Sequence, residues 1–247
     1  MKILSAHQLQ FIPWLGYFSK IKTSKKYVIL DNLKYSNLSF QTRNKIKNIS
    51  LDNWTWLIIP INKKSTGNLF SDVLIDERNK NWRSKHLKTI HQSYSKTKHF
   101  DEVFTDIENI YKSEEINLSK FIYTFIQYGL KTFKIDTEIF FQSTLHEQGL
   151  SRFNKKSKLL LDITKYLDCD CFLFGSNANK YFFDEEKNFF KKNNVHYLFQ
   201  KYNHPKYKQI HPGDFLPNLS FLDILFNCGK TNSVKYLEKS EITKSIL

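Results

Sequence analysis

The chain has few cysteines and no long apolar run. Its three cysteines, Cys169, Cys171 and Cys228, do not make an even set of disulfide partners, and the first two are spaced as CxC rather than as the CxxC of zinc sites. We therefore expect neither a disulfide framework nor a bound metal. No stretch is long and apolar enough to cross a bilayer, and the N-terminus lacks the apolar segment of a signal peptide. These absences predict a cytoplasmic protein without a membrane span.

Several sequence signatures of nucleotide chemistry are also missing. There is no GxGxxG fingerprint and no Walker loop, so the sequence supports neither a dinucleotide-binding enzyme nor a P-loop NTPase. The HxGH motif of HIGH-type nucleotidyltransferases is absent as well. Because no internal repeat or low-complexity linker divides the chain, we interpret residues 1–230 as one α/β domain and residues 231–247 as a polar C-terminal appendage.

Acidic residues are too few to balance the basic ones. The chain has 38 lysines and arginines against 24 acidic residues, which gives a net charge of +14. Such a field attracts anions in general, whether nucleic acid, membrane surface, nucleotide diphosphate or acidic protein. No nucleic-acid-binding motif occurs, so no specific nucleic-acid partner is expected. Arginine is scarce, and its planar fork suits phosphate or carboxylate, so each arginine is a candidate ligand contact: Arg43, Arg78, Arg83 and Arg152.

The first 21 residues predict a binding site. A short buried strand at Ile3 and Leu4 is followed by Pro13, which is favourable in the first turn of a helix. An apolar stripe with helical spacing comes next: Trp14, Tyr17, Phe18 and Ile21. The segment between strand and helix holds His7, Gln8 and Gln10. In open α/β sheets, ligands bind after the carboxyl ends of strands and beside helix N-termini, so we expect a site here, although a capping or packing role for His7 remains open.

Two strand–helix–strand units predict the fold. The strand Tyr27–Leu30 follows the first helix. Later come a strand over 138–142, an amphipathic helix over 156–167 and a strand over 171–174. Such units form parallel strands with right-handed crossovers. We therefore predict an α/β protein with a doubly wound, mostly parallel, Rossmann-like sheet and helices on both faces.

Polar side chains follow these predicted strands. Asp31 ends the second strand and is expected to face the same crevice as His7, or else to form a turn. Ser176 lies in a polar loop, 175–179, after the strand over 171–174. Residues 35–47 are rich in hydrogen-bonding groups with little hydrophobic period, which is typical of a binding loop. Its candidate contacts are Tyr35, Gln41, Arg43 and Asn44.

The remaining elements are predicted from shorter patterns. Two further strands are expected over 54–60 and 195–202, and helical segments over 107–131 and 188–193. Another helix begins at Trp82 and carries Lys88 on its polar face. A last helix follows Ser220, has Asp223 at capping-box spacing and ends at Gly229.

Blocks spread along the chain resemble the WbqC-like family. The first block is His7-Gln8 with Pro13-Trp14-Leu15-Gly16-Tyr17-Phe18. The later blocks are Gln41, Arg43, Asn44 and Ile46; Trp82, Lys85-His86-Leu87-Lys88 and Tyr94; and Leu219–Asn227 with Gly229. Leu9 and Gln10 depart from the family pattern, so they are assigned no role.

The resemblance implies an enzyme of O-antigen or related lipopolysaccharide biosynthesis. It implies an N-acyl or aminoacyl transferase that acts on a nucleotide-linked 4-amino-4,6-dideoxy sugar, such as a dTDP-sugar. No bound cofactor is expected. The donor would be a thioester on coenzyme A or on an acidic acyl or peptidyl carrier protein, and such anions would be attracted by the positive charge of the chain.

The same resemblance, together with the chemistry of amide formation, suggests roles for individual residues. His7 would be the general base, with Asp31 orienting it or holding a sugar hydroxyl. Arg43 and Lys88 would hold phosphate, and Gln8 and Asn44 would donate hydrogen bonds. Further substrate contacts are Trp14, Tyr17, Tyr35, Gln41 and Ser176.

Two other functions remain open from the sequence. One is nucleotidyl transfer or carboxylate adenylation with ATP. The other is non-enzymatic binding of an anion or nucleic acid, which the charge permits but no motif supports.

Overall fold

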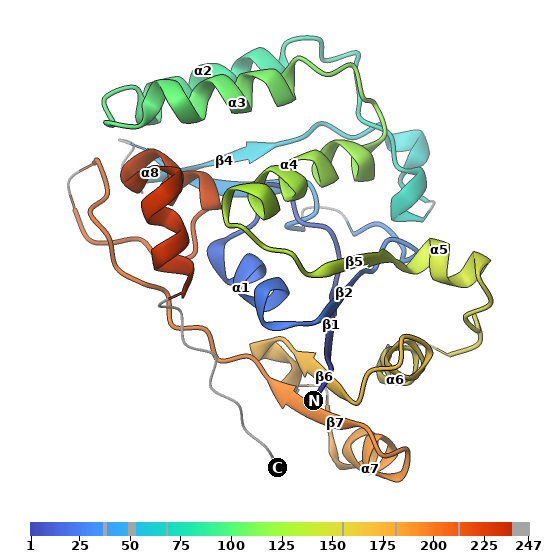
Figure 1. The fold of residues 1–247 in the computed structure, drawn as a ribbon. Helices are drawn as coiled ribbons and strands as arrows, with labels where there is room; N and C mark the ends of the chain where they lie inside the picture. Colours follow the sequence, from blue (N-terminus) through green and yellow to red (C-terminus); the bar gives the residue numbers. More distant parts are fainter. Residues whose placement is uncertain are drawn as a thin grey trace.

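The central sheet has five parallel strands, and its strand order reverses between β1 and β6 (Figure 1). The order is β5 (Glu138–Phe141), β2 (Lys26–Ile29), β1 (Ile3–His7), β6 (Cys171–Phe174) and β7 (His196–Phe199). From β1 the chain winds to β2 and β5 on one side, and later returns to β6 and β7 on the other. Such a switch point leaves a crevice at the carboxyl ends of the two central strands.

The computed structural model describes residues 1–36, 39–48, 53–67, 69–154, 156–180, 182–211 and 213–238. Within these ranges no helix has the length and apolar character needed to span a membrane.

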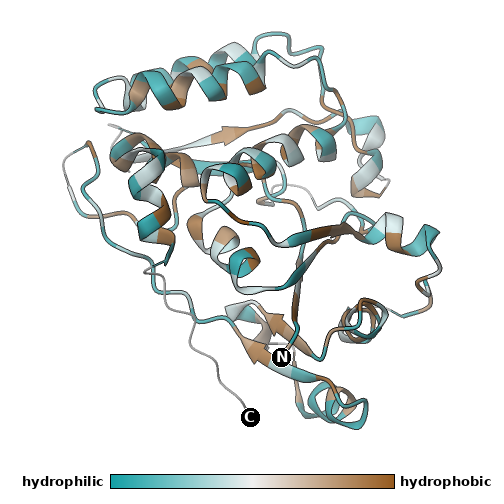
Figure 2. Ribbon diagram, viewed as in Figure 1, coloured by the Kyte–Doolittle hydropathy of each residue, from teal (hydrophilic) through white to brown (hydrophobic). Residues whose placement is uncertain are grey.

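Helices cover both faces of the sheet, which confirms the predicted doubly wound α/β fold. On one face the core contains residues of α1 (Leu15–Thr23), α4 (Leu118–Thr132) and α8 (Phe221–Glu238). On the other face it contains residues of α5 (Gln142–Glu147), α6 (Lys156–Tyr166) and α7 (Asp184–Lys192). Figure 2 shows mainly hydrophobic strands in the sheet and alternating hydrophobic and hydrophilic residues along the helices around it.

A second, antiparallel pair of strands lies on the α1 side of the sheet. β3 (Arg43–Lys47) pairs with β4 (Trp54–Ile58), β3 packs against α2 (Trp82–Tyr94), and α3 (Phe100–Tyr111) packs beside α2 (Figure 1). Short 3₁₀ helices complete the described elements: η1 (Lys63–Ser65), η2 (Phe70–Asp72) and η3 (Ser176–Lys180).

The prediction of a binding loop over 35–47 is wrong for its last five residues, because residues 43–47 form β3. Asn44 and Ile46 point inward and are buried, while the three alternate positions carry cations. With one apolar residue on the inner face, the strand has too little hydrophobic alternation to be recognised. Residues 37 and 38 of that loop lie outside the described residues.

Other boundaries also differ from the predictions. The helical region over 107–131 is two helices, because Asn117 caps α4: its Oδ1 accepts a hydrogen bond from the Lys120 N–H at 3.1 Å. The short helix over 188–193 begins earlier, at Asp184, with three acidic residues in its first turn. Gly229 has the positive φ, 76°, of a helix-ending glycine, but α8 resumes after a kink and continues to Glu238. The predicted appendage over 231–247 thus begins inside α8, and residues 239–247 lie outside the described residues.

Candidate active site

A cavity of about 680 Å³ lies at the carboxyl ends of β1 and β6, at the switch point of the sheet. Its volume is in the range of pockets that bind small molecules. The lining comes from the end of β1 and the loop after it, the first turns of α1, and β6 with η3. Single residues come from the loops after β2 and β7, the loop before β3, β3 itself, α6 and the segment before α8. Of the residues predicted from sequence, it includes His7, Gln8, Trp14, Tyr17, Asn44 and Ser176.

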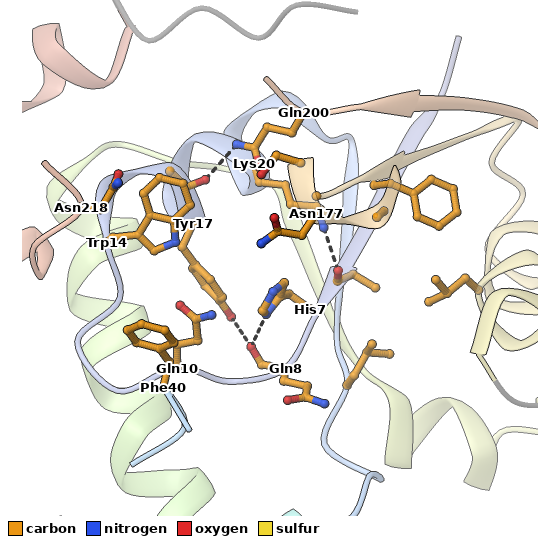
Figure 3. Close-up of a pocket in the computed structure, with 18 of the residues that line it drawn as sticks. His7, Gln8, Gln10, Trp14, Tyr17, Lys20, Phe40, Asn177, Gln200 and Asn218 are labelled. Atoms are coloured by element: carbon orange, nitrogen blue, oxygen red, sulfur yellow. Dashed lines mark hydrogen bonds between the residues drawn. The ribbon is translucent and has the colours of Figure 1, made fainter. Parts of the chain in front are cut away.

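His7 ends β1 and presents one unprotonated ring nitrogen. Its Nδ1–H donates to the Gln8 carbonyl at 3.0 Å, since a carbonyl can only accept, and the Tyr17 hydroxyl donates to the same oxygen at 3.3 Å (Figure 3). The Tyr17 ring packs edge-on against the imidazole, with 5.6 Å between ring centroids. In the neutral imidazole Nε2 therefore carries a lone pair.

The pKa of His7 is lowered to about 4, chiefly by burial and then by the positive charge of Lys20. The imidazole is thus uncharged throughout the physiological pH range. It can accept a hydrogen bond at Nε2, but it is a weak base.

Lys20 is a site residue that the sequence reasoning missed. It lies on α1, is 5% exposed, and its Nζ donates to the Ala6 carbonyl at 2.9 Å (Figure 3). No ion pair with Lys20 occurs among the described residues. Burial lowers the pKa of its ammonium group to about 7. The signal in the sequence was a lysine three positions after Tyr17, beside the apolar stripe of the first helix.

Side-chain amides line much of the cavity. They belong to Gln8, Gln10, Asn44, Asn177, Gln200 and Asn218. Gln200 follows β7 and donates from Nε2 to the Gly16 carbonyl at 2.9 Å, which ties the far strand to α1. Gln10 Oε1 is buried and has no hydrogen-bond partner among the described residues. Since buried acceptors are normally satisfied, this oxygen is suited to a donor on a ligand.

The aromatic rings of Trp14, Tyr17 and Phe40 also line the cavity. The Trp14 indole packs edge-on against Tyr202, with 5.0 Å between ring centroids. It also lies over Gly16, where any Cβ would overlap its six-membered ring. Rings with amides around them are typical of sites for polar ligands that have an apolar face.

We expect the Gly16→Ala substitution to lower the free energy of unfolding by about 1–3 kcal/mol, because the new methyl group would overlap the Trp14 indole. Helix propensity alone predicts the opposite sign, a gain of about 1 kcal/mol. Chemical denaturation measures the stability, and the indole N–H signal of Trp14 in NMR spectra reports ring displacement. Gly67→Ala is the control, because no atom of the described part of the chain lies within 4 Å of a Cβ at that position. Stabilisation by Gly16→Ala with an unmoved indole signal would contradict this packing of Trp14 on Gly16.

Asn44 holds the loop between β1 and α1 in place. Its amide donates to the carbonyls of Phe11 at 3.2 Å and Ile12 at 2.9 Å. Ile12 has φ 37°, a left-handed conformation that is costly for a β-branched residue. The hydrogen bonds of Asn44 thus support a strained loop that presents the cavity residues around it. Gln41 does not line the cavity but donates from Nε2 to Gln8 Oε1 at 3.1 Å.

The structure does not bring Asp31 to the cavity. Its carboxylate accepts hydrogen bonds from the Ser143 N–H at 2.9 Å and hydroxyl at 2.6 Å, at the start of α5. Asp31, just after β2, therefore anchors the start of α5 and is not placed to orient His7. Three other predicted contacts also lie outside the lining: Tyr35, Arg43 and Lys88. Lys88 is exposed on α2.

No group of three or more His, Cys, Asp or Glu side chains within the described ranges is arranged to hold a metal ion.

Similarity to known proteins extends over nearly the whole chain. A sequence model described as the WbqC-like protein family matches residues 8–235. The uncharacterized protein Rv1507c of Mycobacterium tuberculosis (strain ATCC 25618 / H37Rv) is 25% identical over 232 residues, which cover 93% of this chain and 95% of that protein. No solved structure matches the chain with statistical significance. The region that matches the family begins one residue after His7 and ends within α8.

Proposed function

Because the chain belongs to the WbqC-like protein family, we propose that it transfers an acyl or aminoacyl group to the amine of a nucleotide-linked 4-amino-4,6-dideoxy sugar in surface-polysaccharide biosynthesis. The reaction would take place in the cavity between the ends of β1 and β6. The observation that carries the proposal is the presence of two basic side chains with lowered pKa values, His7 and Lys20, in one cavity rich in amides and aromatic rings.

Amide formation from a thioester makes a C–N bond and breaks a C–S bond. The sugar nitrogen attacks the thioester carbonyl, the thiolate leaves, and the nitrogen gives up one proton, which the thiolate finally takes up as a thiol. A base whose pKa lies near the working pH is best matched to accept that proton, and Lys20 meets this condition. His7 Nε2 can accept a hydrogen bond from the amine and so orient its lone pair toward the carbonyl.

The tetrahedral intermediate carries a negative charge on the former carbonyl oxygen. An N–H donor aimed at that oxygen stabilises it most in a water-poor site. The amide of Asn177, in η3 just after β6, lines the same cavity and can supply this N–H. The net positive charge of the chain favours the approach of a diphosphate and of a thioester donor on coenzyme A or on an acidic carrier protein.

Binding of a ligand panel tests the proposal. A ligand that binds only the folded state raises the melting temperature by mass action. We expect a larger rise with dTDP- or UDP-linked 4-amino sugars than with the free nucleotides or the matched 4-hydroxy sugars. Stabilisation by ATP without any response to amino sugars would replace the proposal with adenylyl transfer. A response to oligonucleotides alone, steeply dependent on salt, would replace it with nucleic-acid binding.

We expect the His7→Phe substitution to reduce turnover about 100-fold, because it removes the Nε2 acceptor that orients the amine while keeping a ring against Tyr17. Turnover is measured as amide product per unit time at saturating substrate. His204→Phe is a matched control: the Nδ1–H of His204 also donates to the next residue's carbonyl, at 3.0 Å, but His204 does not line the cavity. Equal turnover in the two variants would remove His7 from the chemistry.

A further inference from the structure

One face of the β3–β4 pair carries cations on one strand and indoles on the other. Arg43, Lys45 and Lys47 alternate along β3 and share this face with Trp54 and Trp56. Lys45 lies directly opposite Trp56 in the register, and Lys47 lies opposite Trp54. Lys47 is buried, so it does not belong to the accessible part of this face. We call Phe40, Arg43, Lys45, Trp54 and Trp56 the β3–β4 platform.

The platform cations contact rings instead of acids. The Arg43 guanidinium carbon lies 4.4 Å from the Trp56 ring centre, and Lys45 Nζ lies 3.5 Å from that of Trp54 and 5.1 Å from that of Trp56. Neither Arg43 nor Lys45 forms an ion pair with any described residue. Two adjacent positive charges are thus left for an external anion.

Phe40 joins the platform to the cavity. It lines the cavity, is 51% exposed, and its ring centroid lies 6.2 Å from that of Trp56. The segment before α8 also bridges the two regions, because the Ser220 N–H donates to the Lys45 carbonyl at 2.9 Å and Asn218 lines the cavity. A ligand that fills the cavity and extends past Phe40 therefore reaches the platform.

We propose that the β3–β4 platform binds the nucleoside diphosphate portion of a ligand whose reactive end occupies the cavity. This inference rests on the proposed function, because it assigns a position to the nucleotide of that reaction. The base stacks on the indole of Trp56 and the diphosphate lies against Arg43 and Lys45.

The interaction energies favour replacement of a cation on the Trp56 ring by a nucleobase. An exposed cation–π contact is worth about 0.5–1 kcal/mol, whereas a base stacked on an aromatic ring is worth about 1–3 kcal/mol. A base on Trp56 displaces the Arg43 guanidinium, which is the cation closer to that ring. The flexible stems of Arg43 and Lys45 allow both charged groups to leave the indoles and reach a phosphate. The guanidinium of Arg43 offers a planar fork for two phosphate oxygens.

Two ligands of the proposed reaction contain a nucleoside diphosphate. One is the nucleotide-linked sugar, and the other is coenzyme A, whose adenosine carries a diphosphate. Calorimetric titrations with dTDP and UDP on one hand, and with ADP and 3′-phospho-ADP on the other, distinguish these sources. Preference for the pyrimidine nucleotides assigns the platform to the acceptor, and preference for the adenine nucleotides assigns it to the donor.

The test is the dissociation constant of the preferred nucleotide in variants of the platform. We expect Trp56→Ala to weaken binding about tenfold or more through lost stacking, with Trp56→Phe intermediate. Lys45→Met keeps the apolar stem but should weaken binding several-fold and flatten its salt dependence. Lys192→Ala, which removes an exposed lysine of α7 on the opposite face of the sheet, is the charge-matched control and should leave binding unchanged.

Binding in Trp56→Phe and Lys45→Met equal to the control would overturn the platform proposal, since both variants preserve the bulk of the strand pair. Different results reject the platform proposal and the proposed function. Turnover of an amino sugar with nucleotide binding insensitive to these variants rejects the platform alone. Platform-dependent nucleotide binding without any amide product rejects the acyltransferase alone.

Discussion

Replacement of Lys20 by methionine should raise the free energy of unfolding at pH 6 by about 2–4 kcal/mol while reducing acyl transfer about 100-fold or more. The two effects have one cause, because α1 holds an ammonium group in a place where its charge is poorly solvated. Burial lowers the pKa of Lys20 from 10.5 to about 7. A shift of that size corresponds to about 4–5 kcal/mol of penalty on the charged form. The hydrogen bond to Ala6, which methionine cannot make, offsets about 1 kcal/mol of the gain.

The sign of the pH dependence follows from the same shift. Below pH 7 Lys20 is charged in both the folded and the unfolded chain, so the full penalty is present. Between pH 7 and 10.5 Lys20 is protonated in the unfolded chain and neutral in the folded chain. The free-energy penalty that Lys20 imposes on folding therefore falls as the pH rises toward 10.5, its pKa in the unfolded chain. The stability of the natural protein therefore rises with pH in this window relative to the Lys20→Met variant. The advantage of Lys20→Met should shrink steadily from pH 7 to pH 10.

Denaturation curves at pH 6 and pH 9, together with a pH–rate profile, check both effects. Lys25→Met, which replaces an exposed lysine just after α1, is the control and should change stability by no more than about 0.5 kcal/mol. In the natural protein, turnover should rise with pH through an inflection near 7. Loss of stability on Lys20→Met at pH 6, or a rate profile unchanged by the substitution, would contradict the assignment.

Asp223→Ala should destabilise the fold severely, with a loss of about 3–6 kcal/mol. Its carboxylate is fully buried and accepts three hydrogen bonds: from the Tyr94 hydroxyl at 2.8 Å, the Tyr207 hydroxyl at 2.7 Å and Gln209 Nε2 at 2.9 Å. Alanine would leave these three donors without their partner, and each buried unsatisfied donor costs about 1–3 kcal/mol. The Tyr94 hydroxyl also accepts the N–H of Lys47, so the network reaches β3.

Burial raises the pKa of Asp223, and the hydrogen bonds from both tyrosines and the glutamine oppose that rise. Asp223→Asn keeps one acceptor oxygen and removes the buried charge, so we expect it to cost about 1–3 kcal/mol, less than alanine. Asp214→Ala, which removes an exposed carboxylate from the same region, is the control, and chemical denaturation measures all three variants. A loss below about 1 kcal/mol for Asp223→Ala would show that the three donors find other partners.

The parallel sheet was predictable from the sequence because β1, β2 and β6 are short apolar runs followed by polar residues. Parallel strands buried on both faces produce that pattern. The same rule located His7, Gln8 and Ser176 at one end of the sheet, and the cavity contains all three. Gln10 was given no role, yet it lines the cavity, and its side-chain oxygen has no hydrogen-bond partner in the described part of the chain.

What the sequence could not supply was the direction of individual side chains. Asp31 follows a strand at the expected edge, but the chain places Ser143 within reach of its carboxylate. In the sequence, Lys20 resembles a surface lysine of a helix. Its burial follows from the packing of other elements around α1. The capping-box spacing at Asp223 is a local pattern, whereas its actual partners come from residues 94, 207 and 209. Contacts between distant segments decide each of these cases.

Direct detection of the amide product tests the proposed acyl transfer. The protein is incubated with a nucleotide-linked 4-amino-4,6-dideoxy sugar and a panel of acyl and aminoacyl thioesters, and products are identified by mass spectrometry. We predict one added acyl group on the sugar nitrogen and release of one thiol per product. The amide product and the thiol should both be lost in the His7→Phe and Lys20→Met variants and retained in His204→Phe. Absence of product across the panel, or equal product from the Lys20→Met variant, would contradict the proposal.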